Sequence, residues 1–215
     1  MSVTPRKRLS GEERRAAILG SALAVFADRG YHASSIDDIA REGGVSKALI
    51  YEHFSSKQEL YAELIQHHAD ELFGRIATAI AEAGSAGVAR LGVGVDAFYG
   101  FVEDHRVAWR MLFREVADAE VAMVLDRILA QVTALVAALI AEDPGATKAG
   151  EDDVARDQAI GMLAQMLVGS VQSLANWWAD HQEIPRERIV EITMDFAWLG
   201  LERLSRGERW RLPAP

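Results

Sequence analysis

The chain has 215 residues, of which 50% are hydrophobic, and a formal net charge of −9. This length suits one large domain, or a small domain joined to a larger one, and the hydrophobic content allows a sizeable core. Cysteine is absent, which excludes disulfides and thiol catalysis. No apolar stretch follows the basic run Arg6-Lys7-Arg8, and the longest apolar run, Ala134 to Ala141, is too short to span a bilayer. We therefore expect a cytoplasmic protein without a membrane partner.

The charge is unevenly distributed along the chain. Residues 1–60 contain nine Lys/Arg and eight Asp/Glu, a net charge of +1, which leaves −10 for residues 61–215. A near-neutral first part and an acidic remainder are compatible with nucleic-acid binding by the first part. The same balance predicts only modest affinity for DNA of arbitrary sequence.

The first nine residues are polar and basic, and we interpret them as a flexible arm. Ser10 and Glu13 have the spacing of a capping box, which predicts a helix from there to about Arg29. Gly30 ends this helix. Its apolar positions share one side and predict the core of a small bundle: Ile18, Leu19, Ala22, Val25 and Phe26.

Residues 34–60 predict two short helices, a tight turn between them and the start of a longer helix. Ile36, Ile39 and Ala40 have the spacing of one apolar helix face, and Gly43-Gly44 ends that helix. Ser46 can cap a second helix that runs to residue 54. Since isolated helices of about eight residues are marginal in water, neighbouring helices must hold it in place. Its free side is then a small polar and aromatic face, which fits the recognition helix of a helix-turn-helix unit.

This stretch resembles the DNA-binding signature of the tetracycline-repressor (TetR) family of bacterial transcription regulators. The resemblance covers about a quarter of the chain. It is carried by the helix Ser35-Ile36-Asp37-Asp38-Ile39-Ala40 and by Val45, Ser46, Leu49, Tyr51, Phe54, Lys57 and Leu60. It implies that the second short helix enters the major groove of double-stranded operator DNA. The residues it assigns to contacts with bases or phosphates are Ser35, Ser46, Lys47, Ala48, Leu49, Tyr51, His53 and Lys57.

The rest of the chain predicts further helices and no strand. A helix from Ser56 to about Gly84 is followed by a helix over residues 88–104, a short segment over residues 109–114, and helices over residues 119–142, 152–181 and 186–206. The fold class is therefore all-α, with about nine helices. We expect three parts: the arm over residues 1–9, a three-helix DNA-binding domain over residues 10–56, and a larger effector-binding and dimerisation domain over residues 57–215.

The larger domain is rich in side chains that suit an apolar ligand pocket, although such stripes are more often plain core. A small apolar effector is the expected ligand. Polar amides among the apolar residues add possible ligand contacts, because a buried amide needs a hydrogen-bond partner. The predicted pocket residues are Phe98, Phe101, Trp109, Met111, Phe113, Met123, Gln165, Met166, Asn176 and Trp177.

The last two helices are apolar on more than one side, so each must be covered on two sides. One side can face its own domain, and the other needs a partner. A two-fold homodimer meets this need, agrees with the resemblance and presents two recognition helices to a pseudo-palindromic operator. The predicted interface residues, several of them small, are Gly161, Ala164, Val168, Ala197, Gly200, Leu201 and Leu204.

Catalysis is not expected. The sequence contains no phosphate-binding loop, GxSxG or HExxH motif. Glu63 and His67 could share a metal ion, but no third ligand is evident, so we expect neither a metal nor a cofactor. The favoured function is a repressor released from its operator by the effector. The alternatives are a transcriptional activator or an effector-independent DNA-binding protein of the same fold, and more remotely a helical enzyme.

Overall fold

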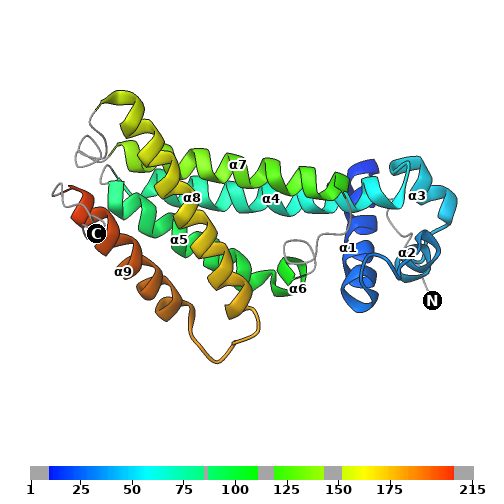
Figure 1. Cartoon of the computed structure of the whole chain (residues 1–215). Coiled ribbons are helices and arrows are strands. Elements are labelled where there is room, and N and C mark those ends of the chain that lie inside the picture. Colours follow the sequence, from blue (N-terminus) through cyan, green and yellow to red (C-terminus); the bar gives the residue numbers. More distant parts are fainter. Residues whose placement is uncertain (1–9, 85–86, 111–118, 143–151, 206–215) are drawn as a thin grey trace, which may run out of the picture. The chain divides into compact units, whose positions relative to one another are not determined.

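The structure is a computed structural model that describes residues 10–84, 87–110, 119–142 and 152–205 (Figure 1). Over these ranges it contains nine α-helices and no strand, which confirms the all-α prediction. The helices are α1 (Gly11–Arg29), α2 (Ile36–Gly43), α3 (Lys47–His53), α4 (Lys57–Glu82), α5 (Gly87–Asp104), α6 (Arg106–Trp109), α7 (Ala119–Ala141), α8 (Asp153–Trp178) and α9 (Arg186–Ser205).

Most helices begin and end close to the residues that the sequence predicts. The helix α6 covers residues 106–109, whereas the sequence predicted only a short segment over residues 109–114. Residues 111–118 lie outside the described ranges, as does the predicted arm over residues 1–9.

The chain divides into two compact units. One consists of Met1–His68 and Val107–Val124, and the other of Ala69–Arg106 and Leu125–Pro215. The division falls inside α4, so the first unit extends beyond the predicted boundary between residues 56 and 57. A single continuous helix of 26 residues, about 39 Å long at 1.5 Å per residue, therefore belongs to both units.

The first unit is built around the apolar side of α1. Ser10 accepts a hydrogen bond from the backbone of Glu13 at 3.1 Å and forms the predicted capping box, and Gly30 ends α1 with φ 75°. The apolar residues predicted for α1 are all buried. The next three helices add further buried side chains to this unit, namely Ile36, Ile39 and Ala40 of α2, Ile50 of α3, Phe54 after it, and Leu60, Tyr61, Leu64 and Ile65 of α4.

The second unit is held by α5, α7, α8 and α9. Leu91 of α5, Leu167 of α8 and Ala197 of α9 form one buried cluster, with Val136 of α7 packed against it. A neighbouring cluster joins α7 and α8. Figure 1 shows α9 (orange to red) running beside α5 (green). Four helices therefore share one apolar core.

Helix α7 is unusually apolar. Its segment Ala122–Ala141 has a mean hydropathy of 1.9 and is long and apolar enough to cross a membrane, judged by length and composition only. The uninterrupted apolar run Ala134 to Ala141 is shorter than this segment, which also includes the charged residues Asp126 and Arg127. One such helix is weak evidence, since helices of soluble proteins meet the same criterion, and it assigns no membrane role.

Candidate nucleic-acid interface

The helix α2 is fixed at its N-terminus by a reciprocal cap. The Ser35 hydroxyl accepts a hydrogen bond from the Asp38 backbone at 3.2 Å, and the Asp38 carboxylate accepts one from the Ser35 backbone at 3.1 Å. The hydrogen bonds from the Ser35 side chain and from Arg41 lower the pKa of Asp38 to about 2. Ser35 is exposed, as a DNA contact requires, but its hydroxyl already serves the cap.

The turn after α2 depends on two glycines. Gly44 adopts the left-handed conformation at φ 60° and ψ 32°, which glycine enters without a Cβ penalty. A Cβ on Gly43 would lie 2.9 Å from the Ser21 hydroxyl of α1, so the end of α2 approaches α1 closely. Val45 is half-buried in the turn and its N–H donates to the Ala40 carbonyl at 3.0 Å. The turn thereby sets the direction of α3 relative to α2.

The helix α3 has one buried side and one exposed side. Ser46 caps it by accepting a hydrogen bond from the Leu49 backbone at 3.1 Å, as predicted. Ile50 and Phe54 are buried. Lys47, Ala48 and Tyr51 are exposed, and Leu49 and His53 are half-buried. Of the residues that the resemblance assigns to DNA, five lie on the side of α3 away from the core, which we call the exposed strip of α3: Lys47, Ala48, Leu49, Tyr51 and His53. Ser46 is the cap of α3, and Ser35 and Lys57 lie outside this helix.

The cation on this strip has an intramolecular partner. The Lys47 ammonium lies 2.9 Å from the carboxylate of Asp37, in the first turn of α2. The side-chain hydrogen bond with Asp37, and the charge of that carboxylate, raise the pKa of Lys47. Lys47 can therefore turn to a nucleic acid only by exchanging this carboxylate for another acceptor.

Lys57 is engaged differently from its prediction. Its ammonium donates to the backbone carbonyls of Tyr31 at 2.8 Å and Ser34 at 2.9 Å, and it lies 4.2 Å from the centre of the Tyr31 ring. These contacts tie α4 to the loop between α1 and α2. They favour a structural role for Lys57 over the predicted contact with the DNA backbone.

One residue that positions α3 was missed by sequence reasoning. The Arg15 guanidinium donates to the Glu63 carboxylate, with an Nε–Oε1 distance of 2.7 Å, and to the carbonyl of His53 at 3.1 Å. It also lies 4.6 Å above the Phe54 ring. Arg15 therefore holds the end of α3 between α1 and α4. Because Glu63 is 48 residues away in sequence, no local pattern could have shown the pair.

The predicted pocket residues do not form one group in the second unit. Phe101 is buried, and Phe98 and Asn176 are half-buried. Trp109 is buried but belongs to the first unit. Met111 and Phe113 lie outside the described residues. The remaining four are exposed in the single chain, and their place in a pocket stays a prediction: Met123, Gln165, Met166 and Trp177.

The predicted dimer residues also differ in burial. Ala164, Val168 and Ala197 are buried, and Ala164 and Ala197 lie in the two apolar clusters of the single chain. These three side chains are therefore covered within the single chain, and their contact with a partner stays a prediction. Gly161 is half-buried and has room for a Cβ. The side chains of Gly200, Leu201 and Leu204 lie outside the described residues, although α9 runs through them.

Large apolar side chains are exposed on the other sides of these helices. They are Met162, Met166 and Trp177 on α8, and Ile192 and Phe196 on α9. Met162 and Met166 are one turn apart, as are Ile192 and Phe196, so each pair continues along one helix side. The two apolar rows visible in the sequence of α8 could have indicated this surface, but not which row faces inwards.

A charged network joins α4 to the end of α5 within the second unit. The Glu71 carboxylate lies 2.9 Å from His105 Nε2 and accepts a hydrogen bond from Arg75 at 2.7 Å, and Arg75 also donates to Asp104 at 2.6 Å. Burial raises the pKa of Glu71, but the hydrogen bonds from Arg75 and His105 outweigh burial and lower it overall.

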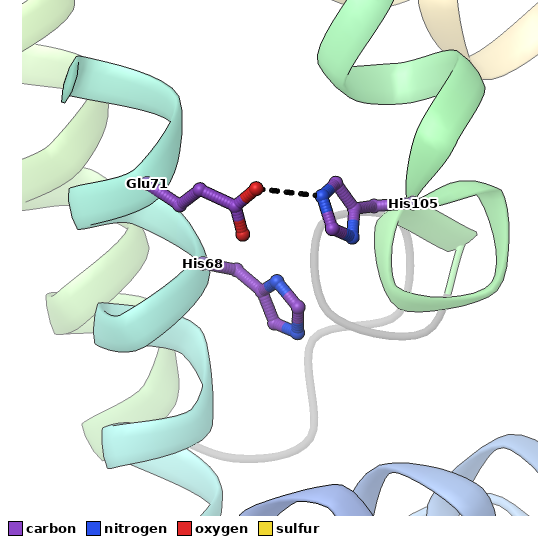
Figure 2. Close-up of side chains that lie close together, drawn as sticks. All are labelled: His68, Glu71 and His105. Atoms are coloured by element: carbon purple, nitrogen blue, oxygen red, sulfur yellow. Dashed lines mark hydrogen bonds and ion pairs between the residues drawn. The ribbon is translucent and has the colours of Figure 1, made fainter. Parts of the chain in front are cut away.

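Figure 2 shows Glu71 beside His105, with His68 one turn earlier on α4. Histidine and glutamate are common metal ligands. Here, however, Arg75 donates to the same Glu71 oxygen and lies 3.2 Å from His105 Nε2. A cation at this point would have to displace a guanidinium, so we interpret the cluster as an ion-pair network.

Together, the capped α2, the glycine turn and the exposed strip of α3 define a helix-turn-helix DNA-binding protein. Residues 18–64 match the family described as bacterial regulatory proteins, tetR family, and residues 88–200 match the tetracyclin repressor-like C-terminal domain. The transcriptional activator FasR of Mycolicibacterium smegmatis is 37% identical over 199 residues, which cover 92% of this chain and 87% of FasR. The chain belongs to the TetR family of bacterial transcriptional regulators, which confirms the resemblance.

Further similarities agree with this placement. The transcriptional repressor KstR2 of Mycobacterium tuberculosis is 40% identical over 70 residues, or 32% of this chain and 35% of KstR2. A TetR-like regulator from Rhodococcus sp. RHA1 gives a TM-score of 0.73 at 27% identity, covering 91% of this chain and 99% of that one. FadR from Bacillus subtilis, solved in complex with stearoyl-CoA, gives a TM-score of 0.67 at 18% identity, covering 90% and 99%. This last likeness is one of fold alone.

Proposed function

We propose that this DNA-binding regulator acts as a homodimer on a pseudo-palindromic operator and that a long-chain acyl effector changes its DNA affinity. The observation that carries the DNA part is the exposed strip of α3, held by its cap, the glycine turn and Arg15. Lys47, Ala48 and Tyr51 are the side chains we assign to the major groove, with Leu49 and His53 at its edges. Ser46 and Ser35, at the N-termini of α3 and α2, are assigned to phosphates, where backbone N–H groups favour anions.

The dimer is proposed to form through the exposed apolar sides of α8 and α9. Five large apolar side chains are exposed on α8 and α9, whose buried sides share one core cluster, and an accumulation of exposed apolar side chains supports an interaction site. A second copy supplies an identical apolar surface, so a two-fold arrangement covers both at once. The dimer would present two α3 helices to successive major grooves.

The effector class is inferred from what the relatives' names and titles state. FadR of Bacillus subtilis was solved with stearoyl-CoA, and it shares the fold of this chain along nearly its whole length. The second unit, which contains most of the match to the C-terminal family domain, has an apolar core that includes Phe101 and Tyr99. We therefore narrow the expected apolar effector to a long-chain acyl thioester. Its binding would shift the population of dimers between DNA-binding and non-binding spacings of α3.

The sign of regulation has two candidates. The sequence favours a repressor, and KstR2, which matches the first unit, is named a repressor. FasR, which matches nearly the whole chain, is named an activator. This whole-chain similarity favours activation as a second candidate. In vitro transcription from a promoter that contains the operator separates the two, because added protein lowers the transcript level in one case and raises it in the other.

In both cases the chain is proposed to act in the cytoplasm and to carry no catalytic activity, as its relatives are named regulators. The test of effector response is to titrate stearoyl-CoA against the protein–operator complex and to record thermal unfolding in parallel. We expect the operator affinity to change at least about tenfold, together with a raised melting temperature. Unchanged affinity and unchanged melting temperature at saturating ligand would favour the effector-independent alternative.

A further inference from the structure

We propose that Asp37 is a specificity-determining residue that holds Lys47 away from arbitrary DNA, so that Lys47 is released only where the bases offer a better acceptor. The inference rests on the proposed function, because it assumes that α3 reads the major groove. It starts from one contact, the 2.9 Å ion pair between the Lys47 ammonium and the Asp37 carboxylate. Both side chains are about half exposed, at 49% and 58%, so both remain accessible to a duplex.

The two residues are placed by the helix-turn-helix itself. Asp37 lies in the first turn of α2, where the helix dipole favours a carboxylate, and Lys47 is the first residue of α3. The tight turn at Gly43 and Gly44 joins the C-terminal end of α2 to the N-terminal end of α3, and the Lys47 side chain reaches back to Asp37. The ion pair is therefore part of the surface that would face DNA, with an acid beside the base-reading cation.

The pairing of Lys47 fits a wider pattern in the first unit. Between residues 10 and 60, every basic side chain has a partner within the protein. Arg29 and Arg41 share the Asp38 carboxylate, Arg15 pairs with Glu63, and Lys57 bonds to carbonyls. A phosphate must compete with these intramolecular partners. Among the paired cations, Lys47 is the one that belongs to the strip of α3 assigned to bases.

The consequence differs between arbitrary DNA and the operator. On arbitrary DNA, Lys47 gains one phosphate contact but loses its Asp37 partner, and the freed carboxylate repels the phosphates. At the operator, Lys47 also donates hydrogen bonds to base acceptors such as guanine O6 and N7, and these make its contact with DNA more favourable. Removing the Asp37 charge should therefore strengthen binding to arbitrary DNA more than binding to the operator, and the ratio of the two affinities should fall.

The experiment compares full-length protein variants on a random-sequence duplex and on an operator recovered by in vitro selection with the unmodified chain. The variants are Asp37→Asn, Lys47→Gln and the two combined, with Glu42→Gln as control. Glu42 is an exposed acid on the same helix α2, and its substitution makes the same change of charge. Fluorescence anisotropy between about 50 and about 200 mM salt gives affinities and salt dependence. Circular dichroism confirms that each variant is folded.

We expect Asp37→Asn to tighten binding to the random duplex by about three- to tenfold and to steepen its salt dependence, with a smaller effect at the operator. Glu42→Gln should change the affinity for the random duplex by less than half as much as Asp37→Asn does. In the Lys47→Gln background the effect of Asp37→Asn should shrink to that of Glu42→Gln, because there is no cation left to release.

An equal effect of Asp37→Asn and Glu42→Gln would overturn the inference, since the change would then reflect net charge alone. So would an Asp37→Asn effect that persists in full without Lys47. In both of these cases DNA binding itself remains, so the proposed function stands while this inference fails. Absence of DNA binding by the unmodified chain and every variant would overturn both.

Discussion

The Tyr99 hydroxyl of α5 donates a hydrogen bond to the Thr193 hydroxyl oxygen of α9, with the two oxygens 3.0 Å apart. The direction follows from the partner of Thr193, whose single hydroxyl proton is donated to the Ile189 carbonyl at 2.8 Å. Both side chains are buried, and burial raises the pKa of Tyr99 to about 12 despite the hydrogen bond to Thr193. This pair joins α5 and α9 inside the apolar core of the second unit.

The two partners of this pair should not be equivalent on substitution. Thr193→Val leaves the Tyr99 hydroxyl buried without an acceptor and should lower the free energy of unfolding by about 1 to 3 kcal/mol. Tyr99→Phe leaves Thr193 with its donation to Ile189 intact and should cost about 1 kcal/mol or less. The double variant should be less destabilised than the sum of the two. Urea unfolding monitored by circular dichroism measures all three, and equal costs for the single variants would contradict the assigned direction.

Lys57 should matter for folding more than for DNA contact. Lys57→Met removes two hydrogen bonds to carbonyls and the contact with the Tyr31 ring, and should lower the free energy of unfolding by roughly 2 kcal/mol. Under conditions where this variant is fully folded, DNA affinity should fall less than about threefold, since no phosphate contact is lost. Thermal unfolding measures the stability of the variant, and fluorescence anisotropy measures its DNA affinity. Unchanged stability with a large loss of affinity would restore the predicted role of Lys57 at the DNA backbone.

The cap of α2 predicts a specific dependence of stability on pH. The pKa of Asp38 is lowered from 3.8 to about 2 in the folded chain, so the charged carboxylate stabilises the native state. This contribution is fully present above the unfolded value and is lost as the pH falls through the folded one. The difference in unfolding free energy between the unmodified chain and Asp38→Asn should thus be constant near neutral pH and shrink between about pH 4 and about pH 2. A difference that stays constant down to pH 2 would contradict the shift.

The exposed apolar side of α8 provides a direct test of dimerisation. Met166 is 66% exposed, and Met166→Glu should convert the dimer to monomers because it places a charge in an apolar interface. Met123 on α7 is 59% exposed, so Met123→Glu makes the same chemical change at matched exposure outside the proposed interface. Sedimentation equilibrium should show monomers for the first variant and dimers for the second. Dimers in both cases would place the interface elsewhere.

Local signals predicted the helices well, because they act over three or four residues. Ser10 with Glu13, Ser46 before α3 and Gly44 after α2 each satisfy backbone groups at a helix end, and the structure places all three as the sequence indicated. The start of α4 is capped in a less regular way. Ser56 accepts a hydrogen bond from the Glu59 backbone, whereas the Glu59 carboxylate accepts one from the Ser55 backbone.

The faces of the later helices could not be predicted in the same way. Ala164 and Met166 both lie on an apolar side of α8, and only packing against α7 decides that Ala164 is inside. The small side chains were assigned to the dimer although close packing within the chain uses them equally well. The pairs Arg15 with Glu63 and Tyr99 with Thr193 span 48 and 94 residues, so they depend on the tertiary fold and leave no local signal.

The central claim is that the exposed strip of α3 recognises operator DNA. It is tested most directly by fluorescence anisotropy with an operator recovered by in vitro selection, using the unmodified chain, Tyr51→Phe and Tyr51→Ala at several salt concentrations. We predict tight, salt-dependent binding of one dimer per operator, weakened about tenfold or more by Tyr51→Ala and less by Tyr51→Phe, with unfolding temperatures unchanged. Binding to a selected operator that is no tighter than to random DNA, and that is insensitive to Tyr51→Ala in a folded protein, would contradict the account.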